Sequence, residues 1–317
     1  MLRNFTSVYL FAVLCALIVT PAQATVQRAY VASWGNDSNA AYDCWITTPC
    51  RWFYTAVTVV SPNGEVVALD SAAYGPVTLT QSISLTSAPG AYAGMSVFPV
   101  STAGVTIATS GVNVVLRGLT INGQGGPAGV LMTNGAQLSI ENCVISNFSG
   151  AGQRGIFVNA AATVRIVNTL VRDNDTGVEL QGGATATISR SKFLGNGLGI
   201  FANGTIATTS ATVRDSLVTG GNTGILAWSQ TTSAINQINV IRSTISNNYG
   251  AGISSEAHPN GTASVTISKN MITANNFGLF IQGGAAGSSA TLKSYGNNTI
   301  TDNSVEASSP PTLVSPI

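Results

Sequence analysis

The repeating unit of this protein is visible in residues 137–159, which read QLSIENCVISNFSGAGQRGIFVN. Three short segments of this stretch, around Leu138, Ile145 and Ile156, alternate apolar and polar side chains, and Asn, Ser and Gly residues separate them. Alternation with a period of two is typical of β-strands, and Asn and Gly are typical of the bends between strands. The stretch therefore predicts one repeat made of three short β-strands.

The same three segments recur along the chain. The residue after the middle segment falls at positions 123, 147, 173, 196, 220, 247, 274 and 302. The copies of the middle segment are Thr120-Ile121-Asn122, Val144-Ile145-Ser146, Leu170-Val171-Arg172, Phe193-Leu194-Gly195, Leu217-Val218-Thr219, Thr244-Ile245-Ser246, Met271-Ile272-Thr273 and Thr299-Ile300-Thr301. A Gly opens the segment that follows, at Gly129, Gly155, Gly177, Gly199, Gly224, Gly252 and Gly278.

Three strands in each repeat of roughly two dozen residues predict an all-β fold, a right-handed parallel β-helix with three strands per coil. Each coil would pair with its neighbours at a spacing of ~4.8 Å, and the inward side chains would stack into an apolar column. Leucine-rich repeats would need a dense Leu pattern that is missing, and a β-propeller would need four strands per repeat. The many Gly, Asn, Ser and Thr residues also disfavour long helices.

The composition excludes several classes of function. Only 8% of the 317 residues are charged and the formal net charge is +1, against roughly 25% charged residues in an average soluble domain. No basic field exists to hold a phosphate backbone, so we expect no nucleic-acid partner. The surface must take its polarity from amides and hydroxyls, which indicates a β-rich extracellular scaffold.

The N-terminus has the features of a secretory signal peptide over residues 1–24. Arg3 supplies a positive start, residues 8–19 are apolar, and Ala22-Gln23-Ala24 matches a cleavage site. An uncleaved membrane anchor is the alternative, but the apolar stretch is short for a bilayer. We expect a protein that is secreted, periplasmic or on the cell surface, without membrane contact after cleavage.

The mature chain keeps three cysteines. The spacing of Cys44 and Cys50 in an exported protein predicts a local disulfide, whereas Cys143 in an apolar run predicts a buried thiol. The disulfide would pin a short helix within residues 49–60 that caps the N-terminal end. We therefore divide the mature chain into a cap segment (residues 25–64), the β-helix (65–303) and a loose tail (304–317).

Three stretches of the N-terminal part carry a resemblance to a known family. Residues 29–37 (AYVASWGND), 49–53 (PCRWF) and 64–67 (GEVV) resemble the start of secreted bacterial β-helix proteins of the pectate-lyase-like superfamily. The repeats after residue 105 resemble the same group, which includes pectate lyases, polygalacturonases and epimerases. The polygalacturonase motifs are absent, and His258 does not match their Gly-His-Gly motif, so no catalytic residue carries over.

Alternation predicts which side chains of the Gly-opened segment face outward. They form two columns, one with the apolar or aromatic members and one with mostly amides. Aromatic rings stack on sugar faces and amides bind hydroxyl groups, so parallel coils would offer a linear track to an extended extracellular or cell-wall polysaccharide. The predicted binding residues are Phe157, Asn159, Gln181, Phe201, Asn203, Trp228, Glu256 and Phe280.

Other interpretations of this face stay open. A loop, the tail or a second protomer could cover the apolar column, or it could be scattered exposed surface. Contact with a second protomer would make the protein a structural or adhesive module that forms homo-oligomers.

Catalysis on a uronate-containing polymer is a further alternative, as a lyase, hydrolase or epimerase. Asp173, Asp175 and Glu179 form the densest acidic group, beside Arg172. A lyase would use several carboxylates to hold Ca²⁺ and a basic group, Arg154 or Arg172, to take the α-proton. The plain alternative is a set of solvated bend charges. We expect no cofactor apart from this Ca²⁺, because Cys and His clusters with metal spacing are absent from the sequence.

Overall fold

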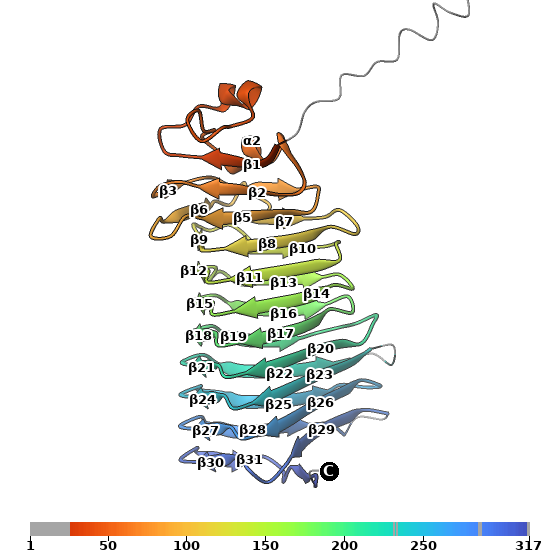
Figure 1. The fold of residues 1–317 in the computed structure, drawn as a ribbon. Helices are drawn as coiled ribbons and strands as arrows, with labels where there is room; N and C mark the ends of the chain where they lie inside the picture. Colours follow the sequence, from red (N-terminus) through yellow and green to blue (C-terminus); the bar gives the residue numbers. More distant parts are fainter. Residues whose placement is uncertain (1–25, 231, 233, 285–286, 316–317) are drawn as a thin grey trace, which may run out of the picture.

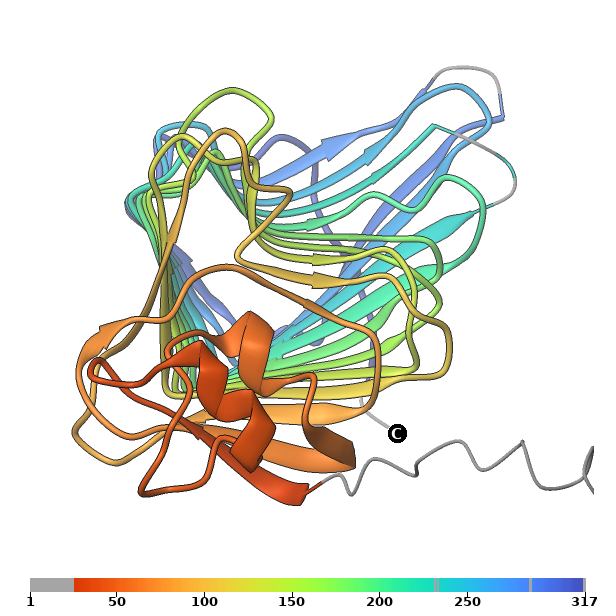
Figure 2. The ribbon, with the colours of Figure 1, turned by 90° about the horizontal axis from the view of Figure 1, so that it is seen from above.

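The computed structural model describes residues 26–315 apart from 231, 233, 285 and 286, and the predicted signal peptide, residues 1–24, lies outside the described residues. The chain winds into coils that stack along one axis (Figure 1), and each coil adds one strand to each of three parallel sheets. Viewed down the axis, the coils enclose a central column (Figure 2). The predicted right-handed parallel β-helix with three strands per coil is confirmed.

We name the three sheets A, B and C in the order in which each coil visits them. The 12 strands of sheet A are β1 (Val26–Val31), β2 (Val60–Ala68), β5 (Ile83–Ser87), β8 (Asn113–Arg117), β11 (Gln137–Glu141), β14 (Thr163–Val167), β17 (Thr185–Ser189), β20 (Thr209–Arg214), β23 (Ile235–Ile241), β26 (Thr262–Ser268), β29 (Ser289–Ser294) and β32 (Thr312–Leu313). The 10 strands of sheet B are β3 (Ala72–Ala73), β6 (Ala93–Val97), β9 (Leu119–Gly123), β12 (Val144–Ser146), β15 (Leu170–Arg172), β18 (Lys192–Leu194), β21 (Leu217–Thr219), β24 (Thr244–Ser246), β27 (Met271–Thr273) and β30 (Thr299–Thr301). The 10 strands of sheet C are β4 (Val77–Leu79), β7 (Val105–Ile107), β10 (Ala128–Met132), β13 (Arg154–Asn159), β16 (Thr176–Gln181), β19 (Leu198–Ala202), β22 (Thr223–Ser229), β25 (Ala251–Ala257), β28 (Phe277–Gln282) and β31 (Val305–Ala307).

The core is the column of side chains that point inward from all three sheets. The predicted inward side chains of sheet C are fully buried, apart from the half-buried Ile281: they are Val130, Met132, Ile156, Val158, Val178, Leu180, Ile200, Ala202, Ile225, Ala227, Ile253, Ser255 and Leu279. Like residues stack on like, since Val178 pairs with Ile156 on one side and with Ile200 on the other. The period-two pattern of the sequence therefore sets both the core and the register.

The glycine that opens each sheet C segment is required by close packing between coils. A Cβ atom at Gly177 would lie 2.6 Å from the carbonyl oxygen of Gly199, and one at Gly199 would lie 2.4 Å from that of Gly224. Gly129, Gly155 and the later members of the column meet the next coil in the same way. Because any larger residue would push neighbouring coils apart, this column explains why Gly recurs at one place in the repeat.

Two ladders of buried polar side chains hold the corners of the coils. At the bend from sheet B to sheet C, the Asn174 side-chain oxygen accepts from the Phe148 N–H at 3.0 Å, and Asn275 accepts from the Asn248 N–H at 3.0 Å. At the bend from sheet A to sheet B, hydroxyls form most of the ladder, as where Ser191 accepts from the Thr169 N–H at 3.2 Å, and Asn270 and Asn298 continue it in the last coils. These side chains satisfy backbone donors that the bends bury.

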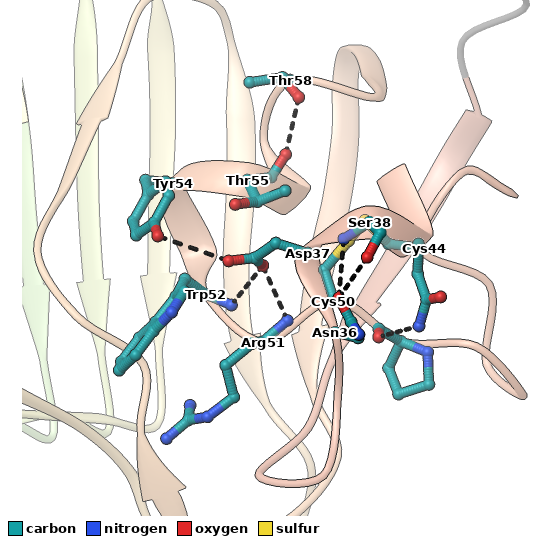
Figure 3. Close-up of a disulfide and its surroundings, with 12 residues drawn as sticks. Asn36, Asp37, Ser38, Cys44, Cys50, Arg51, Trp52, Tyr54, Thr55 and Thr58 are labelled. Carbon is teal, nitrogen blue, oxygen red and sulfur yellow. Dashed lines mark hydrogen bonds between the residues drawn. A yellow bond between two sulfur atoms is a disulfide. The ribbon is translucent and has the colours of Figure 1, made fainter. Parts of the chain in front are cut away.

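The N-terminal end is closed by a cap that a disulfide and a carboxylate hold together (Figure 3). It contains the 3₁₀ helix η1 (Asp37–Tyr42) and the one-turn helix α2 (Phe53–Ala56). The predicted Cys44–Cys50 disulfide is confirmed, with Cα atoms 5.0 Å apart. Asp37 accepts hydrogen bonds from the backbone N–H groups of Arg51 at 3.0 Å and Trp52 at 3.2 Å, so it joins the two helices.

A second carboxylate ties the cap to the first coils. Asp70 accepts from the Ser33 N–H at 2.8 Å and from the hydroxyl groups of Ser33 and Tyr74, and the Tyr74 ring is fully buried. Burial disfavours the charged form of Asp70, but the hydrogen bonds from Ser33 and Tyr74 outweigh it and hold the pKa of this carboxyl below its ordinary value. Burial and the neighbouring carboxylate raise the pKa of the Tyr74 hydroxyl.

The structure differs from the sequence-based expectations in three places. The fourth middle segment is shifted by one residue: Phe193, not Leu194, stacks between Val171 and Val218, because Phe193 fills the core column. The cap helix covers only the four residues of α2 within the predicted 49–60. The segment 304–317 is not loose throughout, since β31 and β32 pair with β28 and β29 and extend the last coil.

Two further observations concern the remaining cysteine and membranes. The predicted buried thiol is confirmed, because Cys143 is free and 2% exposed, and burial raises its pKa to about 11. In the described part of the chain, both helices are far shorter and more polar than a membrane-spanning helix.

Candidate functional site

The outer face of sheet C carries the two predicted columns in register. The first column follows the paired residues Leu131, Phe157, Glu179, Phe201, Leu226, Ser254 and Phe280. In the second column, Asn159 pairs with Gln181, and Trp228 pairs with Glu256. Asn203 continues this column, since its N–H donates to the carbonyl of Leu180 at 2.9 Å. Alternation in the sequence thus placed these side chains on one face correctly.

The aromatic side chains of this face are less exposed than the linear track predicted from the sequence would require. Phe157, Phe201, Trp228 and Phe280 are half-buried. Three members of the first column are buried, Glu179 at 3%, Leu226 at 8% and Ser254 at 0% exposure. The predicted track is therefore a face on which the aromatic rings are only partly accessible.

Three of the four rings contact side chains outside this set: Phe157, Phe280, and Trp228, which meets His258 edge-on. The Arg154 guanidinium lies over the Phe157 ring, 4.5 Å from its centroid, and so occupies one of its faces. The Phe280 ring packs edge-on against Phe277, with centroids 5.3 Å apart. A sugar could not stack on the covered face of Phe157, which leaves Phe201 and Trp228 as the central aromatic pair.

Glu179 is the centre of a buried polar network on this face. Its carboxylate pairs with the Arg154 guanidinium from the preceding coil. It also accepts hydrogen bonds from the side-chain amides of Gln181 at 2.6 Å and Asn203 at 3.1 Å. A buried charge requires such partners, so the network fixes the positions of both amides.

The hydrogen bond to Glu179 also fixes the orientation of the Asn203 amide. Its nitrogen faces the carboxylate, and its buried side-chain oxygen has no hydrogen-bond partner among the described residues. Such unpaired buried acceptors are rare in folded proteins. This oxygen is buried as well as unpaired, so it lies inside the network and is not exposed to solvent.

An aromatic run lies beside this network. The Phe201 and Trp228 rings are 6.4 Å apart and tilted, and the His258 ring meets Trp228 edge-on at 5.3 Å. The sequence analysis did not include His258 among the residues of this face. The sequence does contain a signal for it. His258 stands two residues after the outward Glu256, and the alternation continues past the end of β25, so His258 reaches the same face.

The predicted acidic group does not form one site. Asp173 and Asp175 lie in the bend before β16, whereas Glu179 lies on the outer face of that strand. Asp173 pairs with Arg172 at 2.6 Å, Asp175 accepts from the Gly152 N–H at 2.8 Å, and Glu179 pairs with Arg154. The three carboxylates thus share no partner. Nowhere in the described residues do three or more His, Cys, Asp or Glu side chains form a group that could hold a metal ion.

The described strands of sheet C carry more acidic than basic side chains: Glu179, Glu256 and Glu306 against Arg154. Within the described strands of sheet C, Arg154 is the one cationic residue, and the buried Glu179 neutralises it. Glu256 accepts a hydrogen bond from the Ser254 hydroxyl at 2.6 Å. No cation is left on these strands to pair with an acidic ligand.

Comparisons with known proteins agree with this fold. A family model described as a right-handed beta helix region matches residues 96–238. The structure is similar to that of the pectate lyase Pel9A, with 14% identity, a TM-score of 0.66, and coverage of 91% of this chain and 80% of that one. It is also similar to tailspike protein 2 from the Escherichia coli O157:H7 bacteriophage CAB120, with 15% identity, a TM-score of 0.51, and coverage of 76% and 35%. No curated protein matches the sequence.

Proposed function

We propose that this pectate-lyase-like β-helix binds a neutral polysaccharide along the outer face of sheet C, centred on Phe201 and Trp228. The observation that carries the proposal is the adjacency of this aromatic pair to the amides of Gln181 and Asn203, which Glu179 holds in place. Partly exposed rings contact the apolar faces of sugars, and fixed amides bind their hydroxyl groups. Stacked coils repeat such outward rings and amides along the axis, which suits a chain-like ligand.

The lack of cations on this face supports a neutral ligand. The Arg154 guanidinium is held by Glu179 and by the Gly152 carbonyl and lies over Phe157, so its charge is already neutralised within the protein. Glu256 would repel an acidic polymer. A neutral glycan, by contrast, needs hydrogen-bonding partners for its hydroxyl groups, and the exposed Asn159 and the half-buried Gln181 of the second column are such partners.

The alternatives fit the geometry less well. A Ca²⁺-dependent lyase would need carboxylates that converge, whereas Asp173, Asp175 and Glu179 have separate partners. A homo-oligomer through this face would need a broad exposed apolar patch, whereas Leu226 and Ser254 are buried and the rings are half-buried. Export through the predicted signal peptide stays part of the proposal, and the Cys44–Cys50 disulfide suits an oxidising compartment.

Isothermal titration calorimetry tests the proposal. The probes are neutral hexasaccharides of glucose, xylose, galactose and N-acetylglucosamine. We expect one of them to bind, and Trp228→Ala to weaken that binding about tenfold or more, since tenfold corresponds to about 1.4 kcal/mol. Trp45→Ala is the matched control, because Trp45 is 54% exposed and lies in the disulfide loop of the cap.

Two results would contradict the proposal. One is the absence of heat with every neutral hexasaccharide at millimolar concentration. The other is equal loss of binding in the Trp228→Ala and Trp45→Ala proteins, which would move the site away from sheet C.

A further inference from the structure

A pocket lies at the bend from sheet B to sheet C, near the C-terminal end of the stack. It has a volume of about 480 Å³ and is lined by three consecutive bends, through residues 247–249, residues 274–276, and Asp302 with Ser304. These bends follow β24, β27 and β30. The pocket shares no residue with the Phe201–Trp228 pair on the outer face of sheet C.

Strand register explains why these side chains come together. The last residues of β24, β27 and β30 are successive partners in sheet B, so the residues that follow them share one corner position. These corner residues are Asn247, Ala274 and Asp302. Two residues further along each bend stand Tyr249, Asn276 and Ser304, which form the rim of the pocket on the side of sheet C.

The floor of the pocket is the buried amide ladder, whose groups are already engaged. Asn248 and Asn275 are 1% and 2% exposed. The Asn248 side-chain oxygen accepts from the Gly221 N–H at 3.2 Å, and its amide nitrogen donates to the Asn275 side-chain oxygen at 2.8 Å. Because these bonds hold the floor in place, a ligand must bind mainly through the groups at the rim.

Three polar side chains around this floor are accessible. Asp302, Tyr249 and Asn276 are exposed, and their side chains form no hydrogen bond or ion pair with any described residue. The Tyr249 side chain is 72% exposed. The pocket therefore offers one carboxylate, one aromatic ring and one amide to a ligand.

The small side chain of Ala274 keeps the pocket open. Ala274 has a φ of 56°, in the left-handed region that disfavours Ala. Other coils place Asn147 and Asn247 at this corner position, with φ of 67° and 55°, and Asn accepts this conformation more readily. The Asn147 side chain donates to Asn122 of the preceding coil at 2.7 Å. An Asn at position 274 would reach across the coils in the same way, whereas Ala leaves a gap beside Asp302.

The charged side chains at this corner are all acidic. Among the described residues of the bends from sheet B to sheet C, they are Asp173, Asp175 and Asp302. The first two have partners of their own. In the last three coils the described strands of sheets B and C add Glu256 and Glu306, and every Lys and Arg of these coils lies on sheet A or in its bend into sheet B. Asp302 therefore attracts a cationic ligand without a neighbouring cation to compete.

We propose that this pocket binds an amino sugar residue with a free amine, whose ammonium group pairs with Asp302 while its ring lies against Tyr249. An ammonium group has three donors, which carboxylate and amide oxygens accept. An aromatic ring contacts the apolar face of a sugar and also attracts a cation. The sugar hydroxyl groups bind Asn276 and Ser304.

Other cationic ligands fit the pocket less well. A divalent metal ion takes several oxygen ligands, mostly carboxylates, whereas the pocket contains one carboxylate. A lysine side chain would place its apolar stem on a floor of amides. The site is separate from the proposed glycan site on sheet C and differs from it in the charge of its ligand.

Calorimetry at slightly acidic pH, where the amine is protonated, tests the inference with four probes. They are the linear trimers of glucosamine, N-acetylglucosamine and glucose, and the amide of Nα-acetyl-lysine. We expect the glucosamine trimer to bind at least about tenfold more tightly than each of the others. N-acetylation removes the charge and keeps the ring, whereas the lysine derivative keeps the charge without the ring. The affinity should fall between about 50 and 500 mM salt, because salt screens exposed charges.

Variants locate the site. Asp302→Asn and Tyr249→Ala should each weaken binding of the glucosamine trimer about tenfold. Ala274→Asn should weaken it as much by filling the gap, while the thermal midpoint stays the same or rises, since Asn accepts the left-handed conformation. Asp173→Asn and Tyr42→Ala are matched controls, because Asp173 holds the same corner position in an earlier coil and Tyr42 is 69% exposed in the cap.

Trp228→Ala should leave this binding unchanged, which separates the inference from the proposed function. The inference fails if the glucosamine trimer does not bind at millimolar concentration, or if the N-acetylglucosamine trimer or the lysine derivative binds as tightly. It also fails if Asp302→Asn binds the glucosamine trimer as the unaltered protein does. Loss of binding in Trp228→Ala but not in Asp302→Asn would assign the amino sugar to sheet C instead.

Discussion

Replacing Arg154 by Met should destabilise the fold by stranding a buried charge. The Glu179 side chain is 4% exposed, and Arg154 is its ionic partner. Met keeps much of the volume and the apolar stem of Arg154 but offers no donor. The variant Arg154→Met thus leaves the carboxylate with only the neutral amides of Gln181 and Asn203.

The size of the effect follows from the burial of the two partners. Removing one member of a buried ion pair costs about 3–5 kcal/mol, because the other charge stays buried. The Arg154 side chain is 32% exposed, so water can replace part of its interaction. We therefore expect a loss of about 2–3 kcal/mol in the free energy of unfolding, somewhat below that range.

A double variant separates the ion pair from simple packing. Adding Glu179→Gln to Arg154→Met removes the stranded charge and keeps the hydrogen bonds to the neighbouring amides, so most of the lost stability should return. Urea unfolding followed by circular dichroism measures both proteins. Equal stability of Arg154→Met and the unaltered protein, or a double variant that is less stable than Arg154→Met, would refute the reasoning.

Three other perturbations test the parts of the fold that position the site. Asn275→Ala removes a ladder residue whose side-chain amide makes five hydrogen bonds. It should lower the free energy of unfolding, measured in urea, by about 3 kcal/mol or more. Asn276→Ala, at the exposed neighbouring residue, should change it by less than about 0.5 kcal/mol. Phe193→Ala should cost about 3–5 kcal/mol by leaving a cavity in the core column, and an unchanged thermal midpoint would contradict the shifted register. The pKa of Asp70 is lowered in the folded protein, so its ionised form contributes stability above its ordinary pKa of about 3.9, and this contribution is lost as the pH falls. Asp70→Asn should therefore flatten the fall in thermal midpoint between pH 5 and pH 2. An unchanged pH profile would argue against this role.

The fold was predictable because its determinants are local and repeated. Alternation around Ile156 and Ile200 fixes which side chains enter the core, and the glycine column fixes where each sheet C segment begins. The fourth repeat misled the prediction because Phe193 and Leu194 are both apolar and a Gly follows them. Only pairing with Val171 and Val218 in neighbouring coils decides between the two.

The candidate site was predictable only in part. The sequence placed Phe157 and Phe201 on one outward face, and the strand pairing confirms it, since each of them pairs with Glu179. Their exposure could not be predicted, because Arg154 stands near the start of its strand and reaches both Phe157 and Glu179 across coils. Alternation gives the side of a sheet to which a residue points, but not which long side chain lies over it.

The most direct test of the sheet C proposal is fluorescence from Trp228 alone. The chain contains four tryptophans, and Trp34, Trp45 and Trp52 lie in the cap. Replacing these three by Phe leaves Trp228 as the one reporter. Titration with the neutral hexasaccharide that binds in calorimetry should shift its emission to shorter wavelength with the same dissociation constant, because a sugar on the ring displaces water. Saturated binding without any change in Trp228 emission would place the glycan elsewhere and contradict the proposal.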